Sequence, residues 1–229
     1  MPTKKDASKR WVEIETLVPG APEEVWRAIA TGPGMTACFT PAKVDERVGG
    51  EIVFSFGPGI ESKGVVTGWQ PPFRFAYEER EWQAGAPACA TEVTVEAVSG
   101  GRCVVRMTHT LATTQEDWDK DLESFEGGWP GFFEVLRVYL ANYAGQKAAS
   151  ARTMAMCQFP RAQAWKRLCE SVGLSGADYG DERAAPAGSL SLAGVVERVR
   201  QDANASDIML RIEKPAPAIA WFGAFDWQG

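Results

Sequence analysis

The most strongly patterned stretch of the sequence is an apolar helical stripe. Across Trp129–Tyr143, apolar side chains recur at the i, i+3, i+4 and i+7 positions of one helical face. Gly127–Gly128, just before this stretch, disfavours a helix, and Pro130 suits the first turn of a helix. The spacing predicts a long helix that begins near Trp129 and runs towards Ser150, a length of about 30 Å. A helix with this much apolar surface needs a large partner surface.

The residues before this stripe alternate between apolar and polar positions, as half-buried strands do. Trp11–Val18 is the first such stretch, and a short helix with Pro22 in its first turn follows it. We expect Gly32–Gly34 to end that helix and Met35–Phe39 to add one more helical turn. Further strands are predicted at Lys43–Arg47, Glu51–Phe56, Lys63–Trp69, Arg74–Trp82, Thr91–Val98 and Cys103–Thr110.

Successive strands joined by short turns pair antiparallel. The acidic stretch Thr114–Glu126 is expected to be a loop or short helix that leads to the long helix. One antiparallel sheet with an apolar face and one long helix make a complete two-layer α+β domain, which we assign to residues 1–150. The sheet can curl around the helix, and any volume that the helix does not fill becomes a pocket.

The second part of the chain, residues 151–229, repeats the opening pattern in a shortened form. Arg152–Phe159 is predicted to be a strand and Pro160–Leu174 a helix. A loop at Gly173–Ser189 precedes strands at Leu190–Val199, Asp207–Lys214 and Ala218–Phe225. A unit with so few strands and no second long helix is not expected to close a core alone. We therefore expect a truncated, diverged second unit that packs on the first domain or on a partner subunit.

The composition narrows the function classes. The 229 residues include nine Trp and eleven Phe, which indicates an aromatic core or pocket. The net charge is −6, and the only basic runs are Lys4–Lys5 and Lys9–Arg10, so no nucleic-acid partner is expected. No apolar run is long enough for a membrane span or a signal peptide, which predicts a cytoplasmic protein. The five cysteines are scattered and form no CxxC pair, so no zinc site is expected.

Six stretches carry a resemblance to a known family. They are Pro22–Ile29, Gly49–Phe56, Gly64–Tyr77, Thr91–Val98, Val104–His109 and Gly128–Leu140. Their order and spacing resemble the activator of Hsp90 ATPase homologue (AHSA1-like) family of the START/Bet v 1-like (SRPBCC) superfamily. The resemblance implies a helix-grip fold, in which a curved antiparallel sheet wraps around a long C-terminal helix and leaves a hydrophobic cavity. Where that family usually has an aromatic pair, this chain has Cys38 and Phe39.

Few residues suggest catalysis or a cofactor. His109 is the only histidine, so a two-histidine metal site cannot form, and no metal or cofactor is expected. No GxSxG or phosphate-binding glycine motif occurs. His109 is either a hydrogen-bonded structural residue or a general base at the mouth of a pocket. Tyr77 and Tyr139 are the other candidates for moving a proton.

The predicted ligand-binding wall joins the apolar helical stripe to alternating positions of the strands. Its residues are Phe54, Trp69, Phe75, Tyr77, Val93, Val95, Met107, His109, Trp129, Phe132, Phe133, Leu136 and Leu140. These features favour a non-enzymatic binding protein for a small apolar or amphipathic ligand. One alternative is an enzyme similar to polyketide aromatase/cyclases, with His109, Tyr77 or Tyr139 handling protons. Another is a co-chaperone or stress-response partner that uses the acidic run Glu116–Glu126, and a homodimer is compatible with each.

Overall fold

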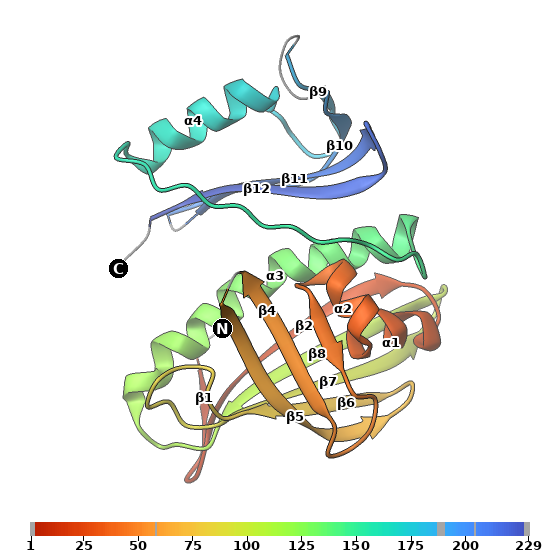
Figure 1. Ribbon diagram of the computed structural model, residues 1–229, viewed down its shortest axis with the longest axis vertical. Coiled ribbons are helices and arrows are strands. Elements are labelled where there is room, and N and C mark those ends of the chain that lie inside the picture. The colour runs from red at the N-terminus through yellow and green to blue at the C-terminus, as the bar shows by residue number, and fades with distance from the viewer. Residues whose placement is uncertain (1–2, 58, 187–190, 204, 227–229) are drawn as a thin grey trace. The chain divides into compact units, whose positions relative to one another are not determined.

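The computed structural model describes residues 3–57, 59–186, 191–203 and 205–226. The described residues form two compact units, Met1–Arg152 and Thr153–Gly229, which we call the N-terminal and C-terminal units. Figure 1 shows the elements of both units, and each unit is considered by itself below.

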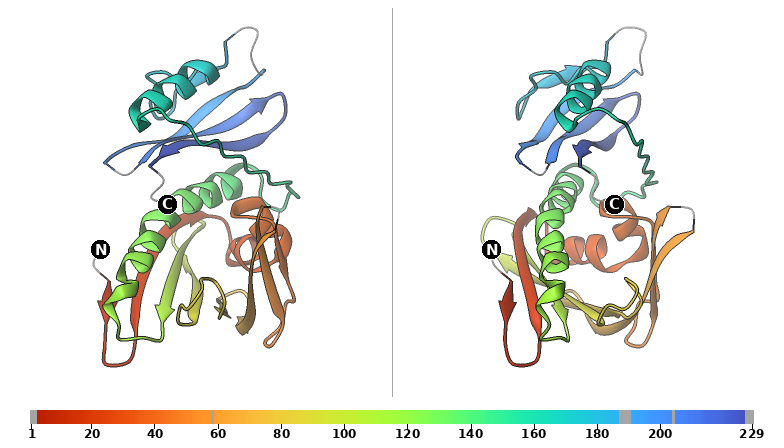
Figure 2. Two further views of the ribbon diagram at one scale, coloured as in Figure 1. Left: turned by 60° about the vertical axis from the view of Figure 1, so that its left-hand side comes forward. Right: turned by 90° about the vertical axis from the view of Figure 1, so that its left-hand side faces the viewer.

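The N-terminal unit is a helix-grip fold of two layers. Its described strands form one eight-stranded antiparallel sheet in the order β1-β2-β8-β7-β6-β5-β4-β3. The strands are β1 (Lys4–Lys5), β2 (Arg10–Pro19), β3 (Ala42–Val44), β4 (Glu51–Gly57), β5 (Ile60–Gln70), β6 (Arg74–Glu79), β7 (Cys89–Val98) and β8 (Arg102–Leu111). The helices are α1 (Pro22–Ala30), α2 (Gly32–Cys38), η1 (Glu116–Trp118) and α3 (Asp119–Asn142). The sheet curves around α3, and α1 and α2 close one end of the space between them (Figure 2).

The predicted boundaries of the long helix are wrong at both ends. Helix α3 begins at Asp119 and ends at Asn142, so Gly127–Gly128 and Pro130 lie inside it. Tertiary contacts hold the part before the glycines. Leu122 is fully buried, and the buried guanidinium of Arg10 on β2 donates to the Asp119 carboxylate, with Nη2 and Oδ2 2.5 Å apart. Packing and this ion pair therefore override residues that are unfavourable in an isolated helix.

Gly32–Gly34 ends the first helix as expected, but it also begins α2. The Thr31 hydroxyl accepts a hydrogen bond from the N–H of Gly34 at 3.2 Å and so caps α2. Gly34 itself lies against the backbone of α1, where a Cβ atom would come within 2.0 Å of the Arg27 carbonyl oxygen. The absence of a side chain at this position sets how closely the two short helices pack.

The C-terminal unit is one helix on a small sheet. Helix α4 (Arg161–Val172) packs on the sheet through Trp165 and Cys169. The described strands of this sheet lie in the order β12-β11-β10-β9. They are β9 (Glu182–Ala184), β10 (Ala193–Gln201), β11 (Ala205–Lys214) and β12 (Ala218–Phe225).

Three expectations for this part of the chain need correction. The stretch Arg152–Phe159 forms no strand, and β9 lies within the predicted loop Gly173–Ser189. Residues 187–190, which include the start of the predicted strand Leu190–Val199, lie outside the described residues. The unit also has a core of its own, because Trp165 and Leu174 are buried with Val196, Ile208 and Leu210. The inference that it could not close a core alone is therefore wrong.

The close approach of α1 and α2 gives a stability prediction. We expect Gly34→Ala to lower the free energy of unfolding by about 3 kcal/mol, the upper end of the usual overpacking cost, because the added methyl meets backbone rather than a movable side chain. Urea unfolding followed by circular dichroism measures the change. The control is Gly128→Ala in α3, where nothing lies within 4 Å of the added Cβ. That variant should be more stable by about 0.5–1 kcal/mol, and equal effects of the two substitutions would contradict the packing argument.

Candidate functional site

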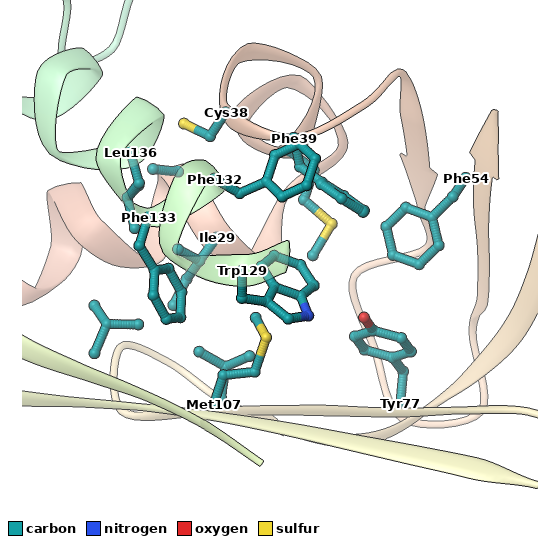
Figure 3. Close-up of a pocket in the computed structure, with 14 residues that line it drawn as sticks. Ile29, Cys38, Phe39, Phe54, Tyr77, Met107, Trp129, Phe132, Phe133 and Leu136 are labelled. Atoms are coloured by element: carbon teal, nitrogen blue, oxygen red, sulfur yellow. The ribbon is translucent and has the colours of Figure 1, made fainter. Parts of the chain in front are cut away.

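An apolar cavity lies between the sheet and α3 in the N-terminal unit. The cavity has a volume of about 40 Å³. Figure 3 shows Tyr77 and Met107 rising from the sheet, with Trp129 and Phe133 reaching towards them from α3. The wall residues are Ala28, Ile29, Met35, Cys38, Phe39, Phe54, Tyr77, Val93, Val105, Met107, Trp129, Phe132, Phe133 and Leu136. Of the described residues that line the cavity, none carries a charged side chain at neutral pH.

Phe39, just after α2, is the centre of the aromatic cluster that fills most of this space. Its ring centroid lies 4.7 Å from that of Phe132, 4.9 Å from that of Trp129 and 5.7 Å from that of Phe54. Phe54 is buried, whereas Phe39, Trp129 and Phe132 are only half-buried. The cavity is therefore closed on one side by aromatic rings that reach the surface.

Eight of the thirteen predicted wall residues line this cavity. They are Phe54, Tyr77, Val93, Met107, Trp129, Phe132, Phe133 and Leu136. The other five do not line it: four are buried elsewhere, Phe75, Val95, His109 and Leu140, and Trp69 is half-buried. Trp69 and Phe75 pack on Trp26 of α1, with ring centroids 5.0 and 6.4 Å from it. Whether a ligand touches any of these residues stays a prediction.

The sequence interpretation missed the contribution of the short helices. Ala28 and Ile29 come from α1, Met35 comes from α2, and Phe39 follows α2. Cys38 of α2, which the sequence offered as a residue facing the cavity, also lines it. Val105 was also missed, although it shares a strand face with Met107 by simple alternation. The apolar stripe of α1 was a usable signal for Ile29, but its direction depends on how α1 packs.

The two tyrosines proposed for proton handling lie in different surroundings. Tyr77 lines the cavity and is 3% exposed, and burial raises its pKa well above the ordinary value, with a smaller contribution from the charge of Glu79. Tyr139 does not line the cavity, and its hydroxyl donates to the carbonyl oxygen of Gln146 at 3.0 Å. Burial also raises the pKa of the Cys38 thiol, which makes it an unreactive packing group.

His109 is buried beside the cavity and not at its mouth. Its side chain is 4% exposed, and its Nδ1 lies 2.9 Å from the hydroxyl oxygen of Thr91. The imidazole stacks on Trp129 at a centroid distance of 5.6 Å and packs against Phe125 at 4.9 Å. Within the part of the chain that the structure describes, Nε2 has no hydrogen-bond partner. Burial lowers the pKa of His109 to about 3, so the ring is neutral at pH 7.

His109 belongs to a short row of polar side chains across the inner face of the sheet. Tyr77 on β6 pairs with Thr91 on β7, and Thr91 pairs with His109 on β8. We call these three residues the polar row. Next to it, Glu79 accepts a hydrogen bond from Ser62, and burial raises the pKa of the Glu79 carboxyl. The row brings together two residues of the predicted wall, and only Tyr77 reaches the cavity directly.

The described residues contain no cluster of three or more His, Cys, Asp or Glu side chains that could hold a metal ion. Among the helices whose residues are described, none has the length and apolar character needed to cross a membrane.

A curved antiparallel sheet that holds a long helix, with an apolar cavity between the two layers, defines the helix-grip class of proteins. The chain belongs to the family described as activator of Hsp90 ATPase homolog 1-like protein, whose family model matches residues 20–141. A search of curated proteins found no match.

Solved structures share the fold at low sequence identity. Protein MLL2253 from Mesorhizobium loti is 20% identical, with 58% of this chain and 98% of that protein covered and a TM-score of 0.53. The solution structure of CalU16 from Micromonospora echinospora is 15% identical, with 73% and 87% covered and a TM-score of 0.53. The Aha1 dimer from Colwellia psychrerythraea is 20% identical, with 57% and 95% covered and a TM-score of 0.46. The likenesses to MLL2253 and CalU16 concern the fold alone.

The buried imidazole predicts a pH dependence of stability. Its pKa is about 3 in the folded chain and 6.5 in its ordinary state, so between these values the unfolded chain binds a proton that the folded chain does not. The free energy of unfolding is therefore unaffected by the titration of His109 above about pH 6.5, and it falls as the pH drops from 6.5 towards 3. From pH 7 to pH 5 the wild type should lose about 2 kcal/mol more than His109→Phe.

Urea unfolding of both proteins at the two pH values measures this difference. His109→Phe keeps an aromatic ring between Phe125 and Trp129, and comparing each protein with itself cancels the baseline cost of the substitution. Equal losses in the two proteins would show that the imidazole takes up its proton as freely in the folded chain as in the unfolded one.

Proposed function

We propose that this protein is a non-enzymatic binding protein that holds a small, uncharged, apolar or amphipathic molecule between the sheet and α3. The observation that carries the proposal is the cavity wall, which is formed by aliphatic, aromatic and sulfur-containing side chains. A charged group placed against such a wall would lose its hydration without gaining a partner. The wall therefore favours a ligand that is neutral where it is buried.

The ligand has to enlarge the cavity to enter it. The cavity volume of about 40 Å³ has room for only a few waters. Ligand pockets usually measure about 300–1,000 Å³. The half-buried rings of Phe39 and Phe132 are the side chains best placed to move, because solvent lies on one side of them. In α3, Pro130 cannot donate a backbone hydrogen bond, and Gly127–Gly128 lowers helix propensity. These features give the helix a weak point beside the cavity.

The alternative of an enzyme similar to polyketide aromatase/cyclases has less support. A base with a pKa of about 3 accepts a proton poorly at pH 7, and His109 is stacked behind Trp129. Tyr139 is outside the cavity and bonded to Gln146. Of the three candidates for proton handling, Tyr77 alone lines the cavity.

The acidic run Glu116–Glu126 gives no separate support for a co-chaperone surface. Glu116 pairs with Lys5 at 3.2 Å, and Asp119 pairs with the buried Arg10. Part of the run therefore anchors the start of α3 within the N-terminal unit.

The proposal is tested by native and denaturing mass spectrometry of freshly purified protein, together with titration by the neutral fluorescent probe N-phenyl-1-naphthylamine. An extra mass seen only under native conditions, or saturable probe binding with one site per chain, supports a ligand cavity. If neither is found, the binding function is wrong.

Filling the cavity should abolish probe binding. Phe133→Trp adds a ring on the cavity wall, so we expect the fluorescence titration to lose saturable binding while circular dichroism stays that of the wild type. Unchanged affinity for N-phenyl-1-naphthylamine in a folded Phe133→Trp protein would place the probe outside the cavity.

Enlarging the cavity should have the opposite effect. Leu136→Ala removes a buried wall residue, and we expect several-fold tighter probe binding at a stability cost of about 2–5 kcal/mol. The matched control is Leu122→Ala, the same substitution in the same helix at a buried position away from the cavity wall. It should cost similar stability without changing probe affinity, and equal tightening in both variants would mean that the probe senses loosened packing in general.

A further inference from the structure

The polar row is an unusual feature for the wall of an apolar core. Tyr77, Thr91 and His109 lie on three adjacent strands and face the same side of the sheet as the cavity residues Val93 and Met107. All three are buried, at 3%, 1% and 4% exposure. Burying polar groups costs free energy unless each finds a hydrogen-bond partner. Burying the polar row therefore costs more free energy than burying apolar side chains at the same positions.

The hydrogen bond within the polar row leaves one nitrogen of His109, Nε2, without a partner among the described residues. The Thr91 hydroxyl pairs with Nδ1 of His109 at 2.9 Å, which fixes the orientation of the imidazole. Nε2 has no partner among the described residues, although native proteins pair almost all buried polar atoms. In a neutral imidazole this nitrogen is a donor or an acceptor, whichever role Nδ1 does not take. It can therefore recognise one polar atom of a ligand.

Trp129 connects this atom to the cavity. The indole lines the cavity and also stacks on the imidazole, with the two ring planes 25° apart. Trp129 follows Gly127–Gly128 and precedes Pro130, so it projects from the weakest part of α3. The indole ring would have to move for the cavity to reach His109, whereas Tyr77 already lines the cavity.

We propose that the polar row is the polar end of the ligand site and that Nε2 of His109 binds a single hydroxyl or carbonyl group of an uncharged aromatic ligand. This inference rests on the proposed binding function and names the ligand class. The aromatic part of the ligand packs among the phenylalanine rings, and its polar group takes the place that Trp129 leaves beside His109. Thr91 acts as a positioning residue, because it orients the imidazole through Nδ1.

The test uses phenol and toluene, which have nearly the same shape, with a methyl group in toluene where phenol has its hydroxyl group. Because the chain has one histidine, nitrogen NMR of the ¹⁵N-labelled full chain reports Nε2 without ambiguity. We expect phenol to shift the Nε2 resonance strongly in wild-type protein at pH 7, while toluene binds without a comparable shift. The same experiment identifies which tautomer is present.

Variants supply a second measurement. His109→Phe should lower the ratio of phenol to toluene affinity by about five- to tenfold, the effect of one hydrogen bond. Thr91→Val should lower the ratio by a smaller factor and move the nitrogen resonances of His109 in the unliganded protein. The matched control is Thr94→Val on the same strand, which faces the other side of the sheet and should change neither quantity.

The outcomes separate this inference from the proposed function. If both probes bind but the Nε2 resonance and the affinity ratio do not respond to the hydroxyl, the cavity binds ligands and the role of His109 is wrong. If phenol, toluene and N-phenyl-1-naphthylamine all fail to bind, both the proposed binding function and the role of His109 are wrong. A hydroxyl-dependent shift together with a reduced ratio in His109→Phe supports both.

Discussion

The structure depends on the burial of one face of α3 against the curved sheet. By itself this helix is a poor one, because three glycines and a proline in its interior together cost about 6 kcal/mol relative to alanine. Buried side chains such as Leu122, Phe133 and Leu136 offset that cost, since each large apolar side chain contributes about 1.5–3 kcal/mol when it leaves water. The helix forms because the sheet is there to cover it, and the same contacts enclose the cavity.

Core and cavity are therefore one surface, and this explains the chemistry of the site. A sheet face that packs on aromatic rings favours neutral side chains, and its polar members have shifted pKa values for that reason. Burial lowers the pKa of His109 and raises those of Tyr77 and Glu79. In each case the neutral form is favoured. The site is thus better suited to hydrogen bonding with a neutral ligand than to carrying charge.

The sequence predicted most of this architecture, and its errors have physical causes. Alternation located β2 and the strands β4 to β8, and the apolar stripe located the second half of α3, because both patterns follow from burial of one face. The first half of α3 was predicted only as a loop or short helix, because the Gly-Gly-Trp-Pro-Gly sequence that follows it resembles a break. The contacts that hold it, such as Arg10 with Asp119, join residues far apart in the chain.

The cavity wall also contains residues that the sequence pattern predicts and residues that depend on tertiary packing. Its strand and helix-stripe residues follow from periodicity, whereas Met35 and Phe39 depend on the packing of α2 against α1 at Gly34. Nε2 of His109, for which the described residues supply no hydrogen-bond partner, is placed by pairing three strands in register and was not visible in the sequence. The weakest turn of α3 carries Trp129, whose ring stacks on the imidazole and also lines the cavity. Local opening of a helix costs less than global unfolding, so the proposed ligand would reach His109 once this turn moves, while the remainder of the sheet and helix stays packed.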